Sequence, residues 1–182
     1  MSELPNTTSK DTSSTISRRK FGKVSATAAS AAFGFQFIPS HAWGNLTKPT
    51  LVAIGAGGKG DNDTRGCAAA GFDIIGLVDV VDAKKLPAKA LKNKRLASVA
   101  NVRKRYPNAQ FWTDYREMIS DMEGKVDAVT VTPPDHHHFH ASVLAMKAGM
   151  HVYCQKPLTH GIWEARMLAK VAAETGVKTQ MG

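Results

Sequence analysis

Residues 51–60 read LVAIGAGGKG, a short apolar run that passes directly into a cluster of glycines. The apolar, β-branched run predicts a buried strand, and the pattern from the glycines through Ala70 predicts a helix. Gly55, Gly57 and Gly60 match the G-x-G-x-x-G spacing of a dinucleotide-binding turn between a strand and a helix. This order of strand, glycine turn and helix predicts the first unit of a parallel α/β sheet.

The glycine positions of this turn have separable physical roles. Gly55 permits the tight bend, Gly57 lets backbone N–H groups approach a diphosphate with no Cβ in the way, and Gly60 lets the helix pack close to the strand. Gly58 and Lys59 open the helix, whose first N–H groups and partial positive charge favour phosphate. We therefore expect these five residues to bind the diphosphate of a dinucleotide, the alternative being a plain flexible loop.

Asp79 supplies the acidic residue that completes this pattern. It follows a second predicted strand, residues 74–78, and lies 19 positions beyond Gly60. At that spacing a carboxylate accepts hydrogen bonds from the adenosine ribose of the cofactor, and its charge disfavours a 2′-phosphate. Asp79 thus favours NAD, while Lys84 and Lys85 leave NADP open.

Strands and helices are predicted to alternate along the remainder of the chain. The predicted strands are residues 109–112, 128–132, 151–154 and 177–181, and the predicted helices are residues 83–106, 114–122, 138–148 and 162–175. These strands are too hydrophobic for exposure on one side, which predicts a Rossmann-type doubly wound parallel sheet with helices on both faces. In such sheets a ligand lies beyond the carboxyl ends of the strands, where Asp79 and the loops at residues 133–135 and 155–157 are expected.

The formal net charge of +9 is concentrated in one stretch. Nine basic residues and no acidic one lie between Ala83 and Tyr106, namely Lys84, Lys85, Lys89, Lys92, Lys94, Arg95, Arg103, Lys104 and Arg105. Apolar residues at helical spacing between them indicate the solvated face of an amphipathic helix, with a site for a polyanion or a cofactor phosphate as the alternative. Because no aromatic residue interleaves the basic ones, nucleic acid is not an expected partner.

Cysteine and histidine spacing predicts no metal or redox centre. Cys67 and Cys154 belong to no CxxC or Cys/His pattern and are interpreted as packing residues, although a disulfide between them is left open. The histidines at residues 136–138 and His140 have only Asp135 as a nearby ligand partner, whereas zinc takes three or four protein ligands. We therefore expect these histidines to line a cleft and cap a helix.

The first 42 residues predict a leader with an export signal. Residues 1–15 are too polar to fold, and residues 17–23, SRRKFGK, resemble a twin-arginine translocation signal. The mildly apolar residues 24–38 are too short for a stable membrane span, and small residues up to Ala42 suit a signal peptidase. We expect the twin-arginine translocase to export the folded protein to the periplasm or beyond, with cleavage after Ala42 and a linker at residues 43–49. The alternative is an amphipathic helix with an accidental arginine pair.

Three segments together resemble the N-terminal half of the glucose-fructose oxidoreductase, inositol dehydrogenase and MocA (Gfo/Idh/MocA) family. They are the glycine turn at residues 55–60, residues 132–138 (TPPDHHH) running into residues 148–152 (AGMHV), and residues 155–159 (QKPLT). The resemblance covers residues 50–182 and implies an NAD(P)-dependent oxidoreductase that acts on a hydroxyl of a sugar, cyclitol or polyol. It also implies a catalytic role beside the nicotinamide for Lys156.

The same resemblance implies further residues at the nicotinamide end of the site. Pro134, Asp135 and His138 are expected to line that side of the cleft, and Gln155 and Pro157 flank the lysine in its motif. The family usually has glutamate where this sequence has Gln155, so a negative charge that normally neighbours the lysine is missing.

The sequence reaches Gly182 where the substrate-binding domain of the family is expected to begin, so that domain is absent from it. We expect the chain to bind its cofactor, with turnover and homo-oligomer formation depending on the missing half. Two other functions fit the same segments, namely an NAD-dependent glycoside hydrolase of the same family and a non-catalytic cofactor-binding remnant.

Overall fold

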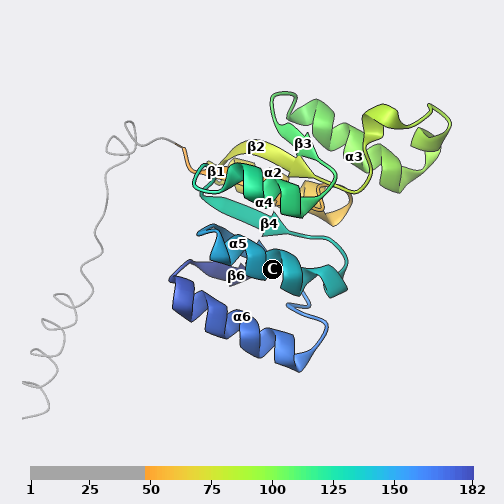
Figure 1. The fold of residues 1–182 in the computed structure, drawn as a ribbon. Coiled ribbons are helices and arrows are strands. Elements are labelled where there is room, and N and C mark those ends of the chain that lie inside the picture. The colour runs from red at the N-terminus through yellow and green to blue at the C-terminus, as the bar shows by residue number, and fades with distance from the viewer. Residues whose placement is uncertain (1–47) are drawn as a thin grey trace, which may run out of the picture. The chain divides into compact units, whose positions relative to one another are not determined.

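The computed structural model describes residues 48–182, and the leader and export signal expected at residues 1–42 lie outside them. The described residues form a six-stranded sheet and five α-helices (Figure 1). The strands are β1 (Thr50–Ile54), β2 (Asp73–Val78), β3 (Gln110–Trp112), β4 (Ala128–Val131), β5 (His151–Cys154) and β6 (Thr179–Met181). The helices are α2 (Lys59–Ala69), α3 (Lys94–Arg105), α4 (Tyr115–Met122), α5 (His138–Lys147) and α6 (Ile162–Thr175).

The strand order is β3-β2-β1-β4-β5-β6, and every pairing is parallel. The chain therefore builds outward from β1 to β3, crosses back over the sheet, and builds outward again from β4. Leu51 pairs with Ala128 and Ile54 with Val131, so the carboxyl ends of β1 and β4 lie side by side. The expected doubly wound Rossmann-type fold is confirmed, and ligands of such sheets bind where the strand order reverses.

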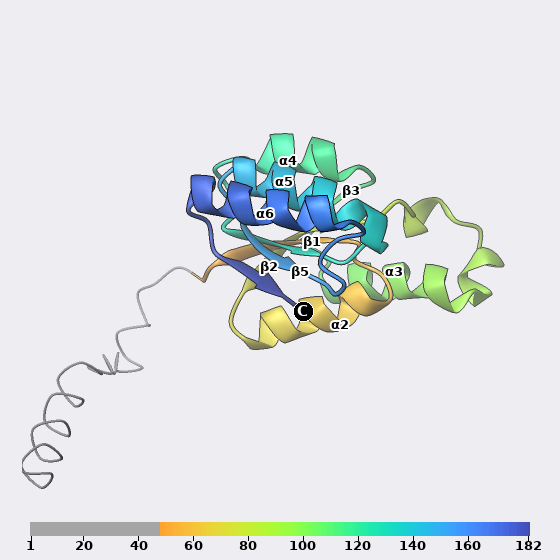
Figure 2. The same ribbon diagram turned by 90° about the horizontal axis from the view of Figure 1, so that it is seen from below.

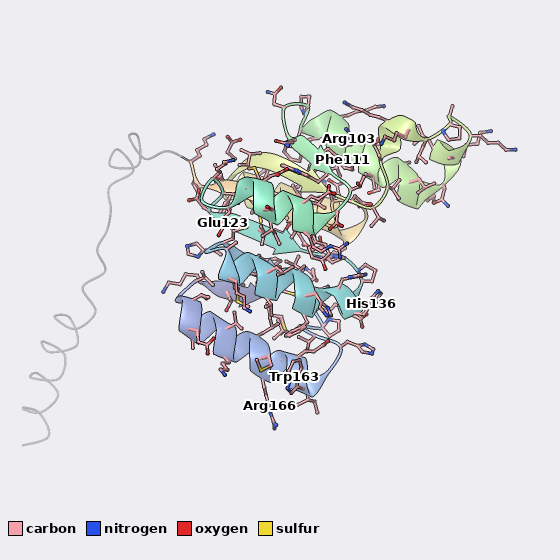
Figure 3. All side chains as sticks on the ribbon, viewed as in Figure 1. Arg103, Phe111, Glu123, His136, Trp163 and Arg166 are labelled. Carbon is pink, nitrogen blue, oxygen red and sulfur yellow. The ribbon has the colours of Figure 1, made fainter. Side chains whose placement is uncertain are left out.

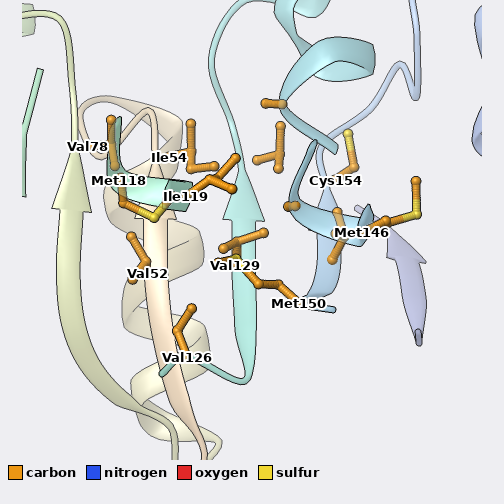
Figure 4. Close-up of a cluster of buried hydrophobic side chains, with 14 of the residues drawn as sticks. Val52, Ile54, Val78, Met118, Ile119, Val126, Val129, Met146, Met150 and Cys154 are labelled. Atoms are coloured by element: carbon orange, nitrogen blue, oxygen red, sulfur yellow. The ribbon is translucent and has the colours of Figure 1, made fainter. Parts of the chain in front are cut away.

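Helices cover both faces of this sheet, as expected. In Figure 2, α4, α5 and α6 lie on one face, and α2 and α3 lie on the other. Val52 and Ile54 of β1 belong to one buried cluster, while Leu51 and Ala53 belong to the other. Because successive side chains point to opposite faces, a strand covered on both sides is apolar throughout. Figure 4 shows the larger cluster, which includes Val78, Met118, Val129, Met146 and Met150.

The prediction of a single helix over residues 83–106 is wrong. The structure has two short 3-10 turns, Ala83–Lys85 and Ala90–Lys92, before α3 begins at Lys94. Proline lacks an N–H group and disfavours helical backbone in the preceding residue, and Leu86, just before Pro87, is extended with φ −85° and ψ 139°. The basic residues are therefore divided between two turns and one helix.

The amphipathic character expected of this basic stretch is confirmed for α3. Val99 and Val102 are buried, with 3% and 0% of their surface exposed. Arg103 forms an ion pair with Asp82, and its guanidinium carbon lies 4.0 Å from the centre of the Phe111 ring (Figure 3). This arginine is therefore engaged within the fold and is not part of a free basic surface.

The two cysteines do not form a disulfide. Cys67 and Cys154 are free thiols, and burial raises the pKa of each above the usual thiol value.

Within residues 48–182 there is no group of three or more His, Cys, Asp or Glu side chains placed to hold a metal ion. In the same part of the chain no helix is both long enough and apolar enough to cross a membrane.

Candidate cofactor-binding site

The glycine turn after β1 is shaped by contacts that leave no room for a side chain. Gly55 has a φ of +79°, and a Cβ there would lie 2.6 Å from the backbone nitrogen of Pro133. A Cβ on Gly60 would overlap the carbonyl oxygen of Gly55, and one on Gly57 would lie 2.7 Å from Cγ2 of Val99. The turn, the start of α2 and the loop after β4 therefore come close together only because these positions are glycine.

α2 begins directly after this turn, and no side chain caps it in the described part of the chain. Its N-cap residue is Gly58, whose φ of +59° favours glycine. The Gly58 N–H donates to Oγ of Ser98 at 2.7 Å, and the Gly57 N–H donates to Oδ2 of Asp79 at 3.0 Å. The uncapped start of α2 keeps the partial positive end of the helix available for an anion such as a diphosphate.

A cavity of about 350 Å³, here called the glycine cleft, opens at the carboxyl ends of β1, β2 and β4. Its lining includes Gly55, Gly57, Asp79, Val80, Tyr115 and Pro134. Oδ1 of Asp79 accepts a hydrogen bond from the Val81 N–H at 3.1 Å, while Oδ2 accepts from Gly57. The carboxylate is therefore fixed beside the glycine turn, where a ribose hydroxyl could reach it.

Lys84 and Lys85, which leave NADP open in the sequence, do not line the glycine cleft. Both side chains are exposed, and Nζ of Lys85 lies 3.9 Å from the carboxylate of Asp82. Of Asp79, Lys84 and Lys85, only Asp79 lines the glycine cleft, and its negative charge favours NAD.

A second cavity of about 330 Å³, here called the lysine pocket, lies between the loops that follow β4 and β5. It is lined by Lys59, Thr132, Pro133, Asp135, His138, Gln155, Lys156 and Pro157. Six of these are site residues that the sequence predicts, and they come from three segments far apart in the chain. The structure brings them together. Pro134, which is also predicted for the nicotinamide end of the site, lines the glycine cleft instead.

His138, at the start of α5, connects the two loops of the lysine pocket. Its side chain is buried, with 2% exposed. Nδ1 lies 2.8 Å from the carbonyl oxygen of Pro157, and Nε2 lies 2.9 Å from the carbonyl oxygen of Pro133. Both ring nitrogens are thus within hydrogen-bond distance of a backbone carbonyl, one in each loop. His138 therefore lines the pocket and also joins its two walls.

Lys156 is exposed in the lysine pocket, and its neighbour Gln155 is buried beside it. The Lys156 N–H donates to Oε1 of Gln155 at 3.3 Å, and Nε2 of Gln155 donates to Oδ2 of Asp63 at 2.9 Å. Asp63 also forms an ion pair with Lys59. Asp63 is not among the residues predicted from the sequence, because nothing in its local pattern shows that its side chain reaches the segment after β5.

Asp135 and the histidines around it set the charge at the edge of the lysine pocket. The His136 N–H, which donates to Oδ1 at 2.9 Å, holds the pKa of Asp135 below its usual value, and His160 and His136 contribute to this in spite of partial burial. Burial lowers the pKa of His137, and His136 and His140 lower it further. Near neutral pH, Asp135 is therefore ionised and His137 is uncharged.

Two further residues of the site are missed by the sequence analysis. Oγ1 of Thr132 lies 2.9 Å from the carbonyl oxygens of both Ile54 and Gly55, so it connects the ends of β1 and β4. Tyr115 lines the glycine cleft from the start of α4. Thr132 is the last residue of one predicted strand and Tyr115 lies three residues after another, and a position at the carboxyl end of a strand is the sequence signal that identifies them.

Known proteins with similar sequences share this site region. The family model GFO_IDH_MocA, described as an oxidoreductase family with an NAD-binding Rossmann fold, matches residues 50–182. D-glucoside 3-dehydrogenase of Escherichia coli is 31% identical over 87 residues, which cover 48% of this chain and 24% of that protein. D-xylose 1-dehydrogenase (NADP(+)) of Hypocrea jecorina is 37% identical over 65 residues, which cover 36% of this chain and 16% of that protein.

Solved structures agree with the fold. An NAD binding oxidoreductase from Klebsiella pneumoniae superposes with a TM-score of 0.59 at 26% identity, covering 75% of this chain and 34% of that one. This chain thus spans 24% of the glucoside dehydrogenase and 34% of the solved oxidoreductase. The family match extends over most of the chain and includes the glycine turn, Asp79 and the lysine pocket. The chain belongs to the Gfo/Idh/MocA oxidoreductase family and contains its NAD-binding Rossmann domain.

Proposed function

We propose that residues 50–182 are the NAD(P)-binding part of an exported oxidoreductase that acts on a hydroxyl of a sugar, cyclitol or polyol. The observation that carries this proposal is the position of Lys156 in a pocket beside the glycine turn, at the carboxyl edge of the sheet. The glucoside and xylose dehydrogenases named above act on sugars, which supports this class of substrate.

The residues present fit a dinucleotide. The cradle formed by Gly55, Gly57 and Gly60 is one that a Cβ would fill, and the start of α2 has no side-chain cap. Backbone N–H groups there would hold the diphosphate, Asp79 would hold the adenosine ribose, and the lysine pocket would receive the nicotinamide. When bound, the nicotinamide supplies the hydride acceptor or donor.

Lys156 is the residue that we assign to proton transfer. Its side chain is exposed to the lysine pocket, so a substrate hydroxyl beside the nicotinamide can reach it. A positioned amine that exchanges a proton with the reacting hydroxyl assists oxidation of an alcohol and reduction of a ketone alike. Asp135, ionised near neutral pH, lines the same pocket.

Titration of the purified chain with NAD and with NADP tests the cofactor assignment. A ligand that binds only the folded state stabilises it by about 2.7 kcal/mol at a hundredfold excess over Kd. We expect a rise in Tm with NAD and a smaller rise with NADP, because the carboxylate of Asp79 repels a 2′-phosphate. Gly57→Val should abolish the rise, since its side chain would meet Val99 and Asp79. No rise with either dinucleotide would contradict the proposal.

Export is proposed from the sequence pattern of residues 17–42 alone. Replacing both Arg18 and Arg19 by lysine should leave the chain inside the cell, because the twin-arginine translocase requires the arginine pair. Cell fractionation measures where the chain is located, and the mass of the exported chain shows whether it has been cleaved after Ala42. Lys20→Arg is the matched control and should be exported normally. Export of the double lysine variant would contradict the proposed route.

A further inference from the structure

Asp63 lies where two parts of the site meet. Its carboxylate is nearly buried, with 8% of the side chain exposed, on the second turn of the helix that follows the glycine turn. Oδ2 accepts a hydrogen bond from Nε2 of Gln155, and Oδ1 pairs with the ammonium group of Lys59. One side chain therefore connects the helix of the diphosphate cradle to the residue that precedes Lys156.

The hydrogen bonds of Gln155 fix the orientation of its amide. Nε2 is a donor only, and it faces the carboxylate of Asp63 at 2.9 Å. Oε1 is an acceptor only, and it receives the backbone N–H of Lys156 at 3.3 Å. With 7% of Gln155 exposed, water does not replace these partners readily. An amide at position 155 is therefore matched to a carboxylate at position 63.

A glutamate at position 155 conflicts with this arrangement. Its second oxygen would stand about where Nε2 stands now, facing the oxygen of Asp63 at hydrogen-bond distance with no proton between them. Two ionised carboxylates at that separation repel each other strongly when they are shielded from water. Gln155, at the position where the family usually has glutamate, is thus consistent with a carboxylate already present at Asp63.

We propose that Asp63 is a positioning residue that supplies, from α2, the single negative charge that a glutamate at position 155 would otherwise supply. Through Gln155 it holds the Lys156 segment against the helix that binds the diphosphate, and through Lys59 it keeps the local charge balanced. The site accepts one carboxylate, at position 63 or at position 155, and not two. This inference rests on the proposed function only for the role of Lys156.

Four chains test it: the wild type, Gln155→Glu, Asp63→Asn, and the double variant. The double variant moves the carboxylate to position 155 and places the amide at position 63, so the hydrogen bond is kept with donor and acceptor exchanged. Gln110→Glu is the matched control, because it adds the same charge at an exposed position of β3. Each chain is measured for Tm without cofactor and for the Kd of NAD, at pH 8 and at pH 5.

We expect Gln155→Glu to bind NAD roughly tenfold more weakly than the wild type at pH 8, since the loss of a hydrogen bond to a charged group is of that size. The Asp63 carboxylate raises the folded-state pKa of the introduced glutamate above its unfolded value. The cost is therefore full at pH 8 and shrinks as the pH falls through that raised pKa, because one carboxyl then takes up a proton and donates it to the other. Gln110→Glu should show neither effect.

The double variant should recover Kd and Tm to within about threefold and a few degrees of the wild type. The inference is overturned if Gln155→Glu behaves as the wild type at pH 8, or if the double variant is no better than Gln155→Glu, including the case in which both fail to fold. If the wild type binds no NAD, the proposed function fails. The Tm values without cofactor then still decide whether positions 63 and 155 are matched.

Discussion

The lining of the glycine cleft combines the backbone of Gly55 and Gly57 with the carboxylate of Asp79, whereas the charged and polar side chains of the lysine pocket come from three separate segments. The first arrangement depends on the absence of side chains at Gly55, Gly57 and Gly60. The second depends on contacts such as those of His138 and Gln155, which join distant loops. We therefore expect the glycine turn to be sensitive to added side-chain atoms, and the lysine pocket to be sensitive to the loss of hydrogen-bonding side chains.

The largest expected effect comes from adding one methyl group to the glycine turn. In Gly60→Ala the new Cβ would overlap the carbonyl oxygen of Gly55, and backbone cannot move aside as a flexible side chain can. We expect a loss of about 4–5 kcal/mol in the free energy of unfolding, measured by urea denaturation, and no NAD binding.

Gly66→Ala, on the same helix, is the matched control for that change. A Cβ at Gly66 meets nothing within 4 Å, and alanine is the better helix former. It should therefore raise stability by about 0.5–1 kcal/mol. Equal effects of the two substitutions would remove the steric basis of the comparison.

The second effect comes from removing a partner in the lysine pocket. His138→Ala removes the ring that lies within hydrogen-bond distance of the carbonyl oxygens of Pro133 and Pro157, and it opens a space in a buried position. We expect a loss of about 2–3 kcal/mol in the free energy of unfolding. Chemical denaturation and NAD titration should show that His138→Gln, which keeps one donor group, loses less than His138→Ala. If both variants were as stable as the wild type, the two loops would not depend on this side chain.

Asp79→Ala is expected to have an intermediate effect on cofactor affinity. The variant loses the acceptor for the ribose and the charge that opposes a 2′-phosphate. NAD should bind roughly tenfold more weakly, which is about 1.4 kcal/mol, while NADP should lose less or gain. Calorimetric titration with both dinucleotides measures this ratio. A parallel loss of both affinities would show that Asp79 does not discriminate between them.

The smallest effect is expected at the opposite, amino-terminal edge of the sheet. The backbone N–H and the hydroxyl of Thr50 donate hydrogen bonds to Oδ2 of Asp127, at 2.7 Å and 2.8 Å. The backbone bond first, and the hydroxyl bond second, hold the pKa of Asp127 below its usual value. A lowered folded-state pKa means that the stabilisation is present at neutral pH and is lost as the pH falls through the folded-state pKa. Asp127→Asn should cost about 0.5–1 kcal/mol at pH 7, and the difference should shrink as the pH falls through the folded-state pKa of Asp127. Any change in NAD affinity would contradict the assignment of the cleft to the other edge.

Sequence periodicity was sufficient for the elements because most of them carry their own local signals. α6 has the predicted bounds, Ile162–Thr175, since a glycine precedes it and Gly176, with a φ of +70°, ends it. The predicted helix at residues 83–106 was wrong because one proline, Pro87, outweighed the apolar spacing around it. Local pattern therefore predicts an element well unless a single backbone constraint interrupts it.

The site could be predicted only where its chemistry is local in the chain. The glycine turn is one continuous segment, and so is the segment from Gln155 to Pro157. Asp63 and Gln155 are 92 positions apart, and nothing in the sequence of either indicates the other. Such a pair becomes visible only once the order of strands is known, which is why Asp63 was missed although six residues that line the lysine pocket were predicted.

The position of β1 at the centre of the sheet has a consequence for the order in which the chain can fold during synthesis. One neighbour, β2, follows within a short stretch, but Thr50 and its partner Asp127 are separated by 77 positions. Until that later segment has left the ribosome, one edge of the first strand has nothing to pair with and apolar side chains stay in water. Closing so long a loop is slow compared with forming a helix. The middle of the sheet therefore stays incomplete until β4 has been synthesised.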